Sequence, residues 1–500
     1  MAQRRQPIVK IAAFFATLII VATLVLAAVG LYFHPGGGYG WMSYFDPWLL
    51  QIVRFSIWQA ALSAFFAVLI ALPLAWCLAG QPFHGQWLVK GLLNLFFIMP
   101  VLTIILGVVA AFSDWFNVFS LEGILLAHLY LNVPYAIRIF WERLSRIAQR
   151  QRQLGRTLGF SRWHQFIWLD WPVLRQALKP VFTMIFLLCF SSFTIVLTLG
   201  GGPANTNLEV AIYQALKFDF DPQAGVLYAV IHALIAFGVM WFLGRRQTLS
   251  LELDREKAQR TVAPSGLQAL VLALMLAALL YPMLALLLHG FSAPWQGSQR
   301  LTQAIGTSLM LACGSGAFAL LLALLRSFSQ RDNRVLRFLD FGLLVMPIMV
   351  VTTGLFLLAL RLNIAFKITG LLIIWLNGLM AMPLIVSPLA TRVTAFRARY
   401  DHLAASLEMG SWTQFRLIYW PALRATLPWC LTLAIVLSVG DLGIAALIGS
   451  AQFVTLPILI YQAMGSYQMV LASQLTLVLL LICGILLVAA EWFSERNRHA

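Results

Sequence analysis

Long apolar runs separated by short polar segments follow one another along the whole chain. Runs such as residues 11–33 and 470–490 consist almost wholly of aliphatic and aromatic residues. A helix needs about 20 such residues to cross a hydrocarbon core about 30 Å thick. Because the runs are apolar on every side, they indicate helices buried in lipid or among other helices.

The pattern predicts an all-α polytopic membrane protein with about twelve transmembrane helices. The first run follows a basic segment, but it is longer than the roughly 7–15 residues of a signal-peptide core, so we interpret it as a retained helix. Pro100, Pro134, Pro347 and Pro383 lie within or near spans and are expected to kink them. The expected spans are residues 11–33, 56–79, 88–111, 121–141, 178–199, 224–243, 267–289, 304–325, 337–360, 369–390, 428–447 and 470–490.

Composition and charge support this reading. Of the 500 residues, 61% are hydrophobic and 10% are charged, against about 45–50% and 25% in soluble domains. The net charge of +16 could indicate a nucleic-acid partner, but its distribution argues for a membrane. All but five of the 34 Lys and Arg residues fall on one side of the predicted spans, so the positive-inside rule places both termini in the cytoplasm. The five exceptions are Arg54, Lys217, Arg300, Arg361 and Lys367.

The chain contains an internal repeat with a fixed interval of 249 residues. It pairs Pro134 with Pro383, and the segment IYQA recurs one residue short of that interval. Two six-helix halves in the same orientation can enclose a central path, as in transporters with parallel repeats. The repeated loop positions are Trp163, Gln165, Phe166, Trp171, Pro172, Leu174 and Arg175, which match Trp412, Gln414, Phe415, Trp420, Pro421, Leu423 and Arg424.

This repeat predicts the domain organisation. Residues 1–55 form a membrane helix and outer loop, and residues 56–243 form the first transmembrane domain. A charged cytoplasmic linker covers residues 244–266 and ends in Pro and Gly. A second helix and outer loop (267–303), a second transmembrane domain (304–490) and a cytoplasmic tail (491–500) complete the chain.

The repeated loops lie on the predicted cytoplasmic side, and each reads as a short helix, a turn and a second helix. One interpretation is an amphipathic segment lying on anionic lipid headgroups. That interpretation explains the basic and aromatic composition, but not the same spacing at two matched positions. Docking of two equivalent partner subunits explains both.

The two loops resemble the signature of permease subunits of binding-protein-dependent ABC importers: Glu-Ala-Ala, three residues, Gly, nine residues, Ile, any residue, Leu-Pro. The acidic residue of the signature is missing from both copies, which puts in doubt any salt bridge that it makes to the ATPase. The first copy comprises Gln153, Leu154, Gly155, Gly159, Trp171 and Pro172, and the second comprises His402, Leu403, Ala404, Glu408, Trp420 and Pro421.

The resemblance implies two repeats of a type I ABC importer transmembrane domain in a bacterial inner membrane. Each loop would be a coupling helix in a groove of one ATPase subunit, so two ATPase copies and a periplasmic substrate-binding protein are the implied partners. Within the family, stretches such as "VRFSIWQAALSA" and "SVGDLGIAALIG" are similar to thiamine-transport permeases. This similarity implies thiamine or its phosphate esters as cargo and a thiamine-binding type of partner; a ferric-iron permease is the nearest rival.

The residues themselves indicate where the chemistry lies. The chain has no G-x-x-x-x-G-K-[ST] loop, so ATP hydrolysis is assigned to a separate subunit and the permease is not an enzyme. The five cysteines stand singly in apolar runs, and neither a metal site nor a cofactor is predicted. A major-facilitator-type secondary transporter is the alternative from another class, and it would need no associated ATPase.

Asp441 is the best candidate for a substrate path. A charged residue at membrane depth costs about 2.5–3.5 kcal/mol on insertion scales, so it invites a functional explanation. Its carboxylate could face the central path and attract a cationic substrate, or it could make a structural hydrogen bond.

The two loops differ at one backbone position. Gly159 supplies permissive geometry in the first loop, whereas Glu408 is not expected to adopt a positive φ in the second. We therefore expect Gly410 to absorb the second bend, and Gly410→Val to impair coupling more than Glu408→Gly.

Overall fold

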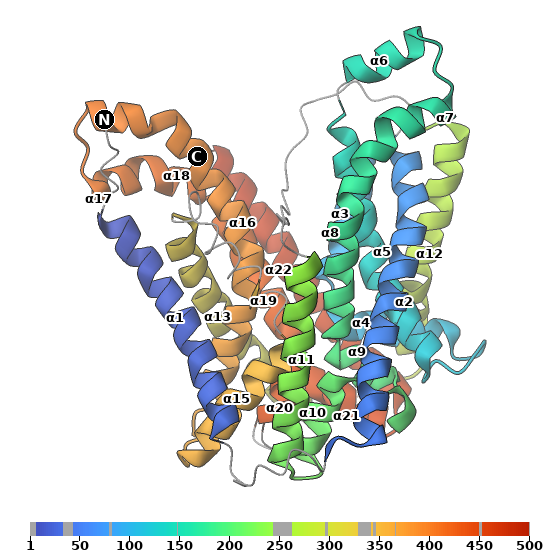
Figure 1. Ribbon diagram of the computed structural model, residues 1–500, viewed down its shortest axis with the longest axis vertical. Coiled ribbons are helices and arrows are strands. Elements are labelled where there is room, and N and C mark those ends of the chain that lie inside the picture. The colour runs from blue at the N-terminus through green and yellow to red at the C-terminus, as the bar shows by residue number, and fades with distance from the viewer. Residues whose placement is uncertain are drawn as a thin grey trace.

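The computed structural model describes residues 7–33, 44–79, 83–147, 149–243, 263–295, 299–328, 342–343, 347–365, 367–449 and 453–499. Helices run roughly parallel to one another through most of this part of the chain (Figure 1). The ends at Pro7 and His499 lie at the same end of the bundle, together with α6 and α17. The expected linker falls mostly outside the described residues, since 244–262 are not among them.

The first half of the chain forms one set of helices that ends with α11. Its elements are α1 (Pro7–Tyr32), α2 (Pro47–Leu78), α3 (Gln86–Ile98), α4 (Val101–Phe112), α5 (Leu121–Ser145), α6 (Gln149–Thr157), α7 (Arg162–Gln165), the π-helix η2 (Phe166–Asp170), α8 (Trp171–Phe190), α9 (Phe193–Leu199), the 3-10 helix η3 (Pro203–Asn205), α10 (Leu208–Lys217) and α11 (Pro222–Leu243).

The second half repeats much of this order. Its elements are α12 (Gly266–Gly290), α13 (Gln299–Ser327), α15 (Ile348–Arg361), α16 (Thr369–Ser406), α17 (Ser411–Gln414), the π-helix η4 (Phe415–Tyr419), α18 (Trp420–Leu423), α19 (Leu427–Val439), α20 (Gly443–Ile448), α21 (Leu456–Gly465) and α22 (Met469–His499).

Many of these helices can cross a membrane. Among the described residues, nine helices are long and apolar enough to do so, and two bent pairs raise the number to as many as 11. The predicted polytopic all-α architecture is therefore confirmed. Of the expected span 337–360, only residues 342–343 and 347–360 are described.

Several expected spans are broken rather than kinked. The span expected over residues 88–111 bends by 99° between α3 and α4, at Met99 and Pro100. Pro100 occupies the N-cap of α4, and Pro347 occupies the N-cap of α15 in the second half. A proline there removes no helical hydrogen bond, because the first N–H groups of a helix have no partner within it. By contrast, Pro134 and Pro383 lie inside continuous helices.

The halves exchange their first helices. Helix α1 packs against α15 of the second half, and α12 packs against α4 of the first. The α1–α15 contact is close: a Cβ on Gly354 would lie 2.2 Å from the Ala27 carbonyl oxygen. Only glycine permits this approach of the two backbones.

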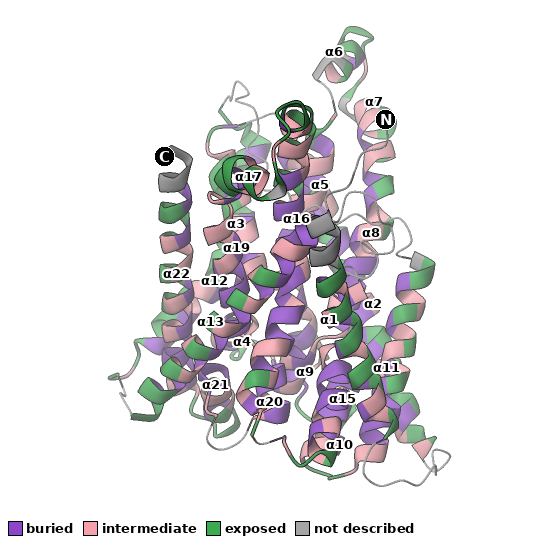
Figure 2. Ribbon diagram, turned by 90° about the vertical axis from the view of Figure 1, so that its left-hand side faces the viewer, coloured by how far each residue is buried: buried purple, intermediate pink, exposed green. Residues whose placement is uncertain are grey.

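Burial separates central from peripheral helices. In the most apolar stretch of α1 and of α12, 28% and 22% of residues are buried, against 56% in α5 and α16. Figure 2 shows the same contrast, with buried residues along α15 and α16 and exposed residues along α1. Peripheral helices with exposed apolar residues are those suited to contact lipid.

Candidate functional site

The first loop, residues 149–172, contains a helix, a tight turn and a second helix. Helix α6 ends in a hydrogen bond from the Phe160 N–H to the Gly155 carbonyl, five residues back, at 2.9 Å. Gly159 lies within this turn with φ of +76°. The arrangement is the C-cap in which a left-handed residue satisfies the last helical carbonyls.

The second loop, residues 398–421, makes the same turn without glycine. The Met409 N–H donates to the Ala404 carbonyl at 3.0 Å, and Glu408 has φ of +50°. The expectation that Glu408 avoids this conformation and that Gly410 absorbs the bend is therefore wrong. A non-glycine residue in the left-handed region costs about 1–2 kcal/mol, which the surrounding hydrogen bonds offset.

The loops also differ from the expected helix pattern. In the first half, α5 ends at Ser145 and α6 is a separate helix, as the short-helix reading requires. In the second half, α16 runs without interruption from Thr369 to Ser406 and enters the loop as one helix of 38 residues. The second loop therefore has no separate first helix.

Repeated side chains stabilise both turns in the same way. Gln165 Nε2 donates to the Phe160 carbonyl at 3.3 Å, and Gln414 Nε2 donates to the Met409 carbonyl at 3.0 Å. Trp163 stacks on Phe166, with 5.4 Å between the ring centroids. Trp412 stacks on Phe415 in the same way, at 5.7 Å. The repeat in sequence is thus a repeat of one folded loop.

Each loop exposes large apolar side chains that a monomeric surface does not require. Trp163 is 64% exposed and Trp412 is 71% exposed. Contiguous exposed apolar residues mark interaction sites. The exposed apolar set consists of Leu154, Leu158, Trp163, Trp168 and Trp171 in the first loop and of Leu403, Leu407, Trp412, Leu417 and Trp420 at the matched positions of the second.

The remaining signature residues have structural positions. Gly155 and Ala404 are buried within their loops, whereas Gln153, His402 and Pro421 are exposed and Pro172 is half-buried. A Cβ on Gly155 would make ordinary van der Waals contact with the Phe160 ring at 3.4 Å, so an alanine, as at the matched Ala404, would also fit there. The signature thus combines small packing residues with an exposed surface.

The loops are anchored by different chemistry at matched positions. In the first loop, the Arg152 guanidinium lies 2.9 Å from Asp170 Oδ1, and Trp76 Nε1 donates to Asp170 Oδ2 at 2.9 Å. In the second loop, the matched residues are Asp401 and Tyr419, and the phenol donates to the carboxylate at 3.1 Å. At these two matched positions, an ion pair in the first half corresponds to a neutral donor on a carboxylate in the second, where Asp401 also lies 3.9 Å from Arg397 of the same helix.

Asp441 lies between α19 and α20 and serves the start of the second helix. Its Oδ2 accepts a hydrogen bond from the Ile444 N–H at 3.2 Å. It also lines a small cavity, large enough for about one water molecule. Other polar residues lining this cavity are Ser308, Asn377, Ser438 and Thr455. The structural hydrogen bond that the sequence left open is therefore present.

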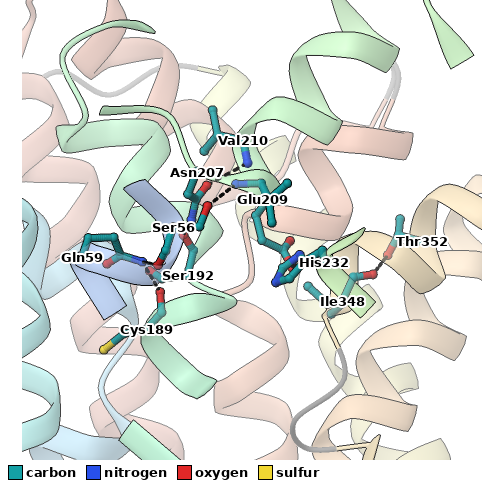
Figure 3. A network of polar contacts seen from close by, with 11 residues as sticks. Ser56, Gln59, Cys189, Ser192, Asn207, Glu209, Val210, His232, Ile348 and Thr352 are labelled. Carbon is teal, nitrogen blue, oxygen red and sulfur yellow. Dashed lines mark hydrogen bonds and ion pairs between the residues drawn. The ribbon is translucent and has the colours of Figure 1, made fainter. Parts of the chain in front are cut away.

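A second acidic group, which the sequence analysis overlooked, lies between the halves. Glu209 on α10 and His232 on α11 are both fully buried, and Glu209 Oε1 lies 3.3 Å from His232 Nδ1. Figure 3 shows them beside Ile348, the first residue of α15. A lone Glu in "NLEVAIYQAL" and a lone His in "AVIHALIAF" are signals that could have identified this pair.

Metal binding finds no support in the part of the chain that the structure describes, where no three His, Cys, Asp or Glu side chains could hold an ion together.

Relatives extend over the whole chain. No family model matches. The thiamine transport system permease protein of Escherichia coli is 34% identical, with 99% of each chain covered, and that of Salmonella typhimurium is 33% identical with the same coverage. The chain belongs to the family of thiamine transport system permease proteins. A molybdate/tungstate transport permease of Thermococcus kodakarensis is 23% identical over 205 residues, 40% of this chain and 81% of its own.

Membership of this family decides between the readings of the sequence. The protein is a multi-pass membrane protein and a permease subunit of an ABC importer, as predicted. The major-facilitator alternative is excluded, since the matched relatives are permeases of another class. The molybdate/tungstate relative aligns over about the length of one half, in accord with a chain built from two.

Proposed function

We propose that this permease carries thiamine or its phosphate esters across the bacterial inner membrane. The support is the name of the relatives, which share about a third of their residues with this chain over nearly its full length. A ferric-iron cargo has no comparable support. Transport would proceed by alternating access, in which the two halves rock about a central path.

The driving force would come from ATP hydrolysis in two copies of a separate ATPase subunit. This proposal is supported by two loops that have the same backbone turn and that expose apolar side chains at matched positions. Each loop would insert into one ATPase copy, with its tryptophans as the buried anchors of the interface. The missing signature glutamates are then no obstacle, because apolar burial supplies the contact.

The remaining partners follow from this orientation. The two described ends of the chain lie on the same side of the helix bundle as the two loops (Figure 1). We assign this side to the cytoplasm. A periplasmic binding protein of the thiamine-binding type would dock at the opposite end. Residues 56–243 and 304–490 would form the two transmembrane domains, and α1 and α12, which precede them, would each pack against the other half.

Co-purification and uptake test this function together. The permease is co-expressed with the ATPase and the binding protein of the same transport system, extracted in detergent and reconstituted with ATP inside liposomes. Trp163→Ala combined with Trp412→Ala is expected to lower ATPase recovery and thiamine uptake by tenfold or more, since each removed anchor typically costs about 2 kcal/mol.

The matched control is Trp115→Ala. Trp115 is 75% exposed but lies in the turn after α4, outside both loops. This variant should retain both ATPase and uptake. An importer extracted without any ATPase, or thiamine uptake that continues without ATP, would contradict the proposal.

A further inference from the structure

Helix α10 begins deep inside the bundle rather than in an outer loop. Its Leu208 N–H donates to Ser56 Oγ at 2.9 Å. Ser56 lies in the third turn of α2, about 14 Å along the helix from its start at Pro47. Glu209 is therefore placed at membrane depth, where an acidic group is unexpected without a function.

The environment of Glu209 is that of a carboxylate without its full set of partners. Its polar neighbours are His232 Nδ1, 3.3 Å from Oε1, and the Met349 backbone at the start of α15. A carboxylate can accept about four hydrogen bonds, so these two neighbours leave part of its capacity unused. A buried carboxyl group with incomplete hydrogen bonding is costly, so this pair destabilises the conformation that buries it.

The fold does not require this pair. In the second half, the register of the repeated IYQA segment places Pro457 at the position of Glu209. The corresponding stretch of α22 carries Leu479, Leu480 and Leu481 in place of histidine. Since the matched helices fold with apolar residues at these positions, the charge in the first half has a purpose other than folding.

The pair also lies where a substrate would pass. Helices α10 and α11 belong to the first half, and both contact α15 of the second. Helix α15 has Pro347 at its N-cap, as α4 has Pro100. Hydrophobic segments interrupted by proline at corresponding positions of two repeats point to the substrate site in transporters of repeated design.

We propose that Glu209 recognises the cationic part of the substrate, a quaternary ring nitrogen, when the halves separate. His232 and the start of α15 cover the carboxylate while the halves are together. This inference rests on the proposed thiamine cargo. Asp441 could take the same role only by giving up the hydrogen bond from the Ile444 N–H, with which its carboxylate caps α20.

The test compares a cationic substrate with a neutral one of the same shape. Proteoliposomes containing the permease, ATPase, ATP and excess binding protein are given thiamine or 3-deazathiamine, its neutral isostere. Glu209→Gln is expected to lower thiamine uptake about tenfold, as loss of a charged contact does. Uptake of the neutral compound should change less than twofold.

Three further variants separate recognition from structure. Glu209→Asp should still take up thiamine in preference to 3-deazathiamine. It is the variant to measure if Glu209→Gln does not assemble. His232→Leu should also retain the preference, because the carboxylate remains. Asp441→Asn should lower uptake of both compounds equally, as expected for a structural group.

The outcomes distinguish the two proposals. Wild-type import of thiamine together with equal effects of Glu209→Gln on both compounds, or no effect on either, would overturn the cation site alone. Loss of the preference in His232→Leu would also overturn it. A wild-type complex that imports neither compound would overturn the proposed cargo and the cation site with it.

Discussion

The first and second loops reach one backbone geometry by different means. Both close their turn with a hydrogen bond five residues back, and both hold it with a glutamine side chain. Yet the left-handed residue is Gly159 in one and Glu408 in the other. Hydrogen bonds and ring stacking therefore specify the turn, while glycine only lowers its conformational cost.

The anchors of the loops differ more than the turns. Asp170 joins the first loop to α2 through Trp76 and to α6 through Arg152. Tyr419 joins the second loop to the end of α16 through Asp401. Two identical ATPase subunits would therefore meet two loops of equal shape but unequal rigidity, and matched substitutions should have unequal effects.

The largest expected difference concerns these anchors. Asp170→Asn leaves Arg152 without its counter-charge and is expected to destabilise the permease by about 2–3 kcal/mol. Tyr419→Phe removes one hydrogen bond to a carboxylate and should cost about 1–1.5 kcal/mol. Thermal unfolding of both variants in detergent checks the order. Equal shifts would show that the two anchors are equivalent.

The next effect concerns the left-handed position of the first loop. Gly159→Val places a β-branched residue at φ of +76° and is expected to cost about 1–3 kcal/mol. A Cβ at Gly159 would meet no atom within 4 Å, so the effect is conformational rather than steric. ATPase stimulation should fall while membrane insertion is retained. Gly159→Glu, which copies the second loop, should be milder, and a silent Gly159→Val would contradict this account.

A smaller effect of opposite sign is expected in the second loop. Glu408→Gly relieves the cost of the left-handed conformation and should stabilise the loop by about 1 kcal/mol or less, because glycine also gains freedom in the unfolded chain. Protease resistance of the loop and ATPase stimulation provide the measurements. A severe defect in Glu408→Gly would show that its carboxylate, and not the turn, is needed for docking.

The smallest effect is expected at Gly410. Its φ is outside the left-handed region, and a Cβ there would meet nothing within 4 Å. Gly410→Val should therefore change stability by less than about 0.5 kcal/mol, as for a surface position without special geometry. From the sequence, Gly410→Val was expected to impair coupling more than Glu408→Gly; the structure instead predicts little impairment at Gly410. A marked fall in ATPase stimulation in Gly410→Val, with little change in Glu408→Gly, would support the expectation from the sequence.

Much of the architecture could be predicted because it depends on local patterns. Apolar runs long enough to span lipid identify membrane helices whatever their neighbours are. The spacing of Trp163, Gln165 and Phe166, repeated after 249 residues, identified two matched loops before any contact was known. These features can be recognised in the sequence because each depends only on residues that are close together along the chain.

Other features were decided only by tertiary contacts. Glu408 adopts its unfavourable φ because the surrounding hydrogen bonds hold the turn in this geometry. These hydrogen bonds cannot be predicted from the conformational preference of a single residue. Pro100 was expected to kink a helix but stands at a sharp break. Glu209 lay in a segment that was expected to be an outer loop. Its burial depends on His232 of the next helix and on α15, which starts more than 100 positions further along the chain. The sequence by itself thus determined which segments enter the membrane and which loops match, whereas only the packing of the two halves decided where charge is buried between them.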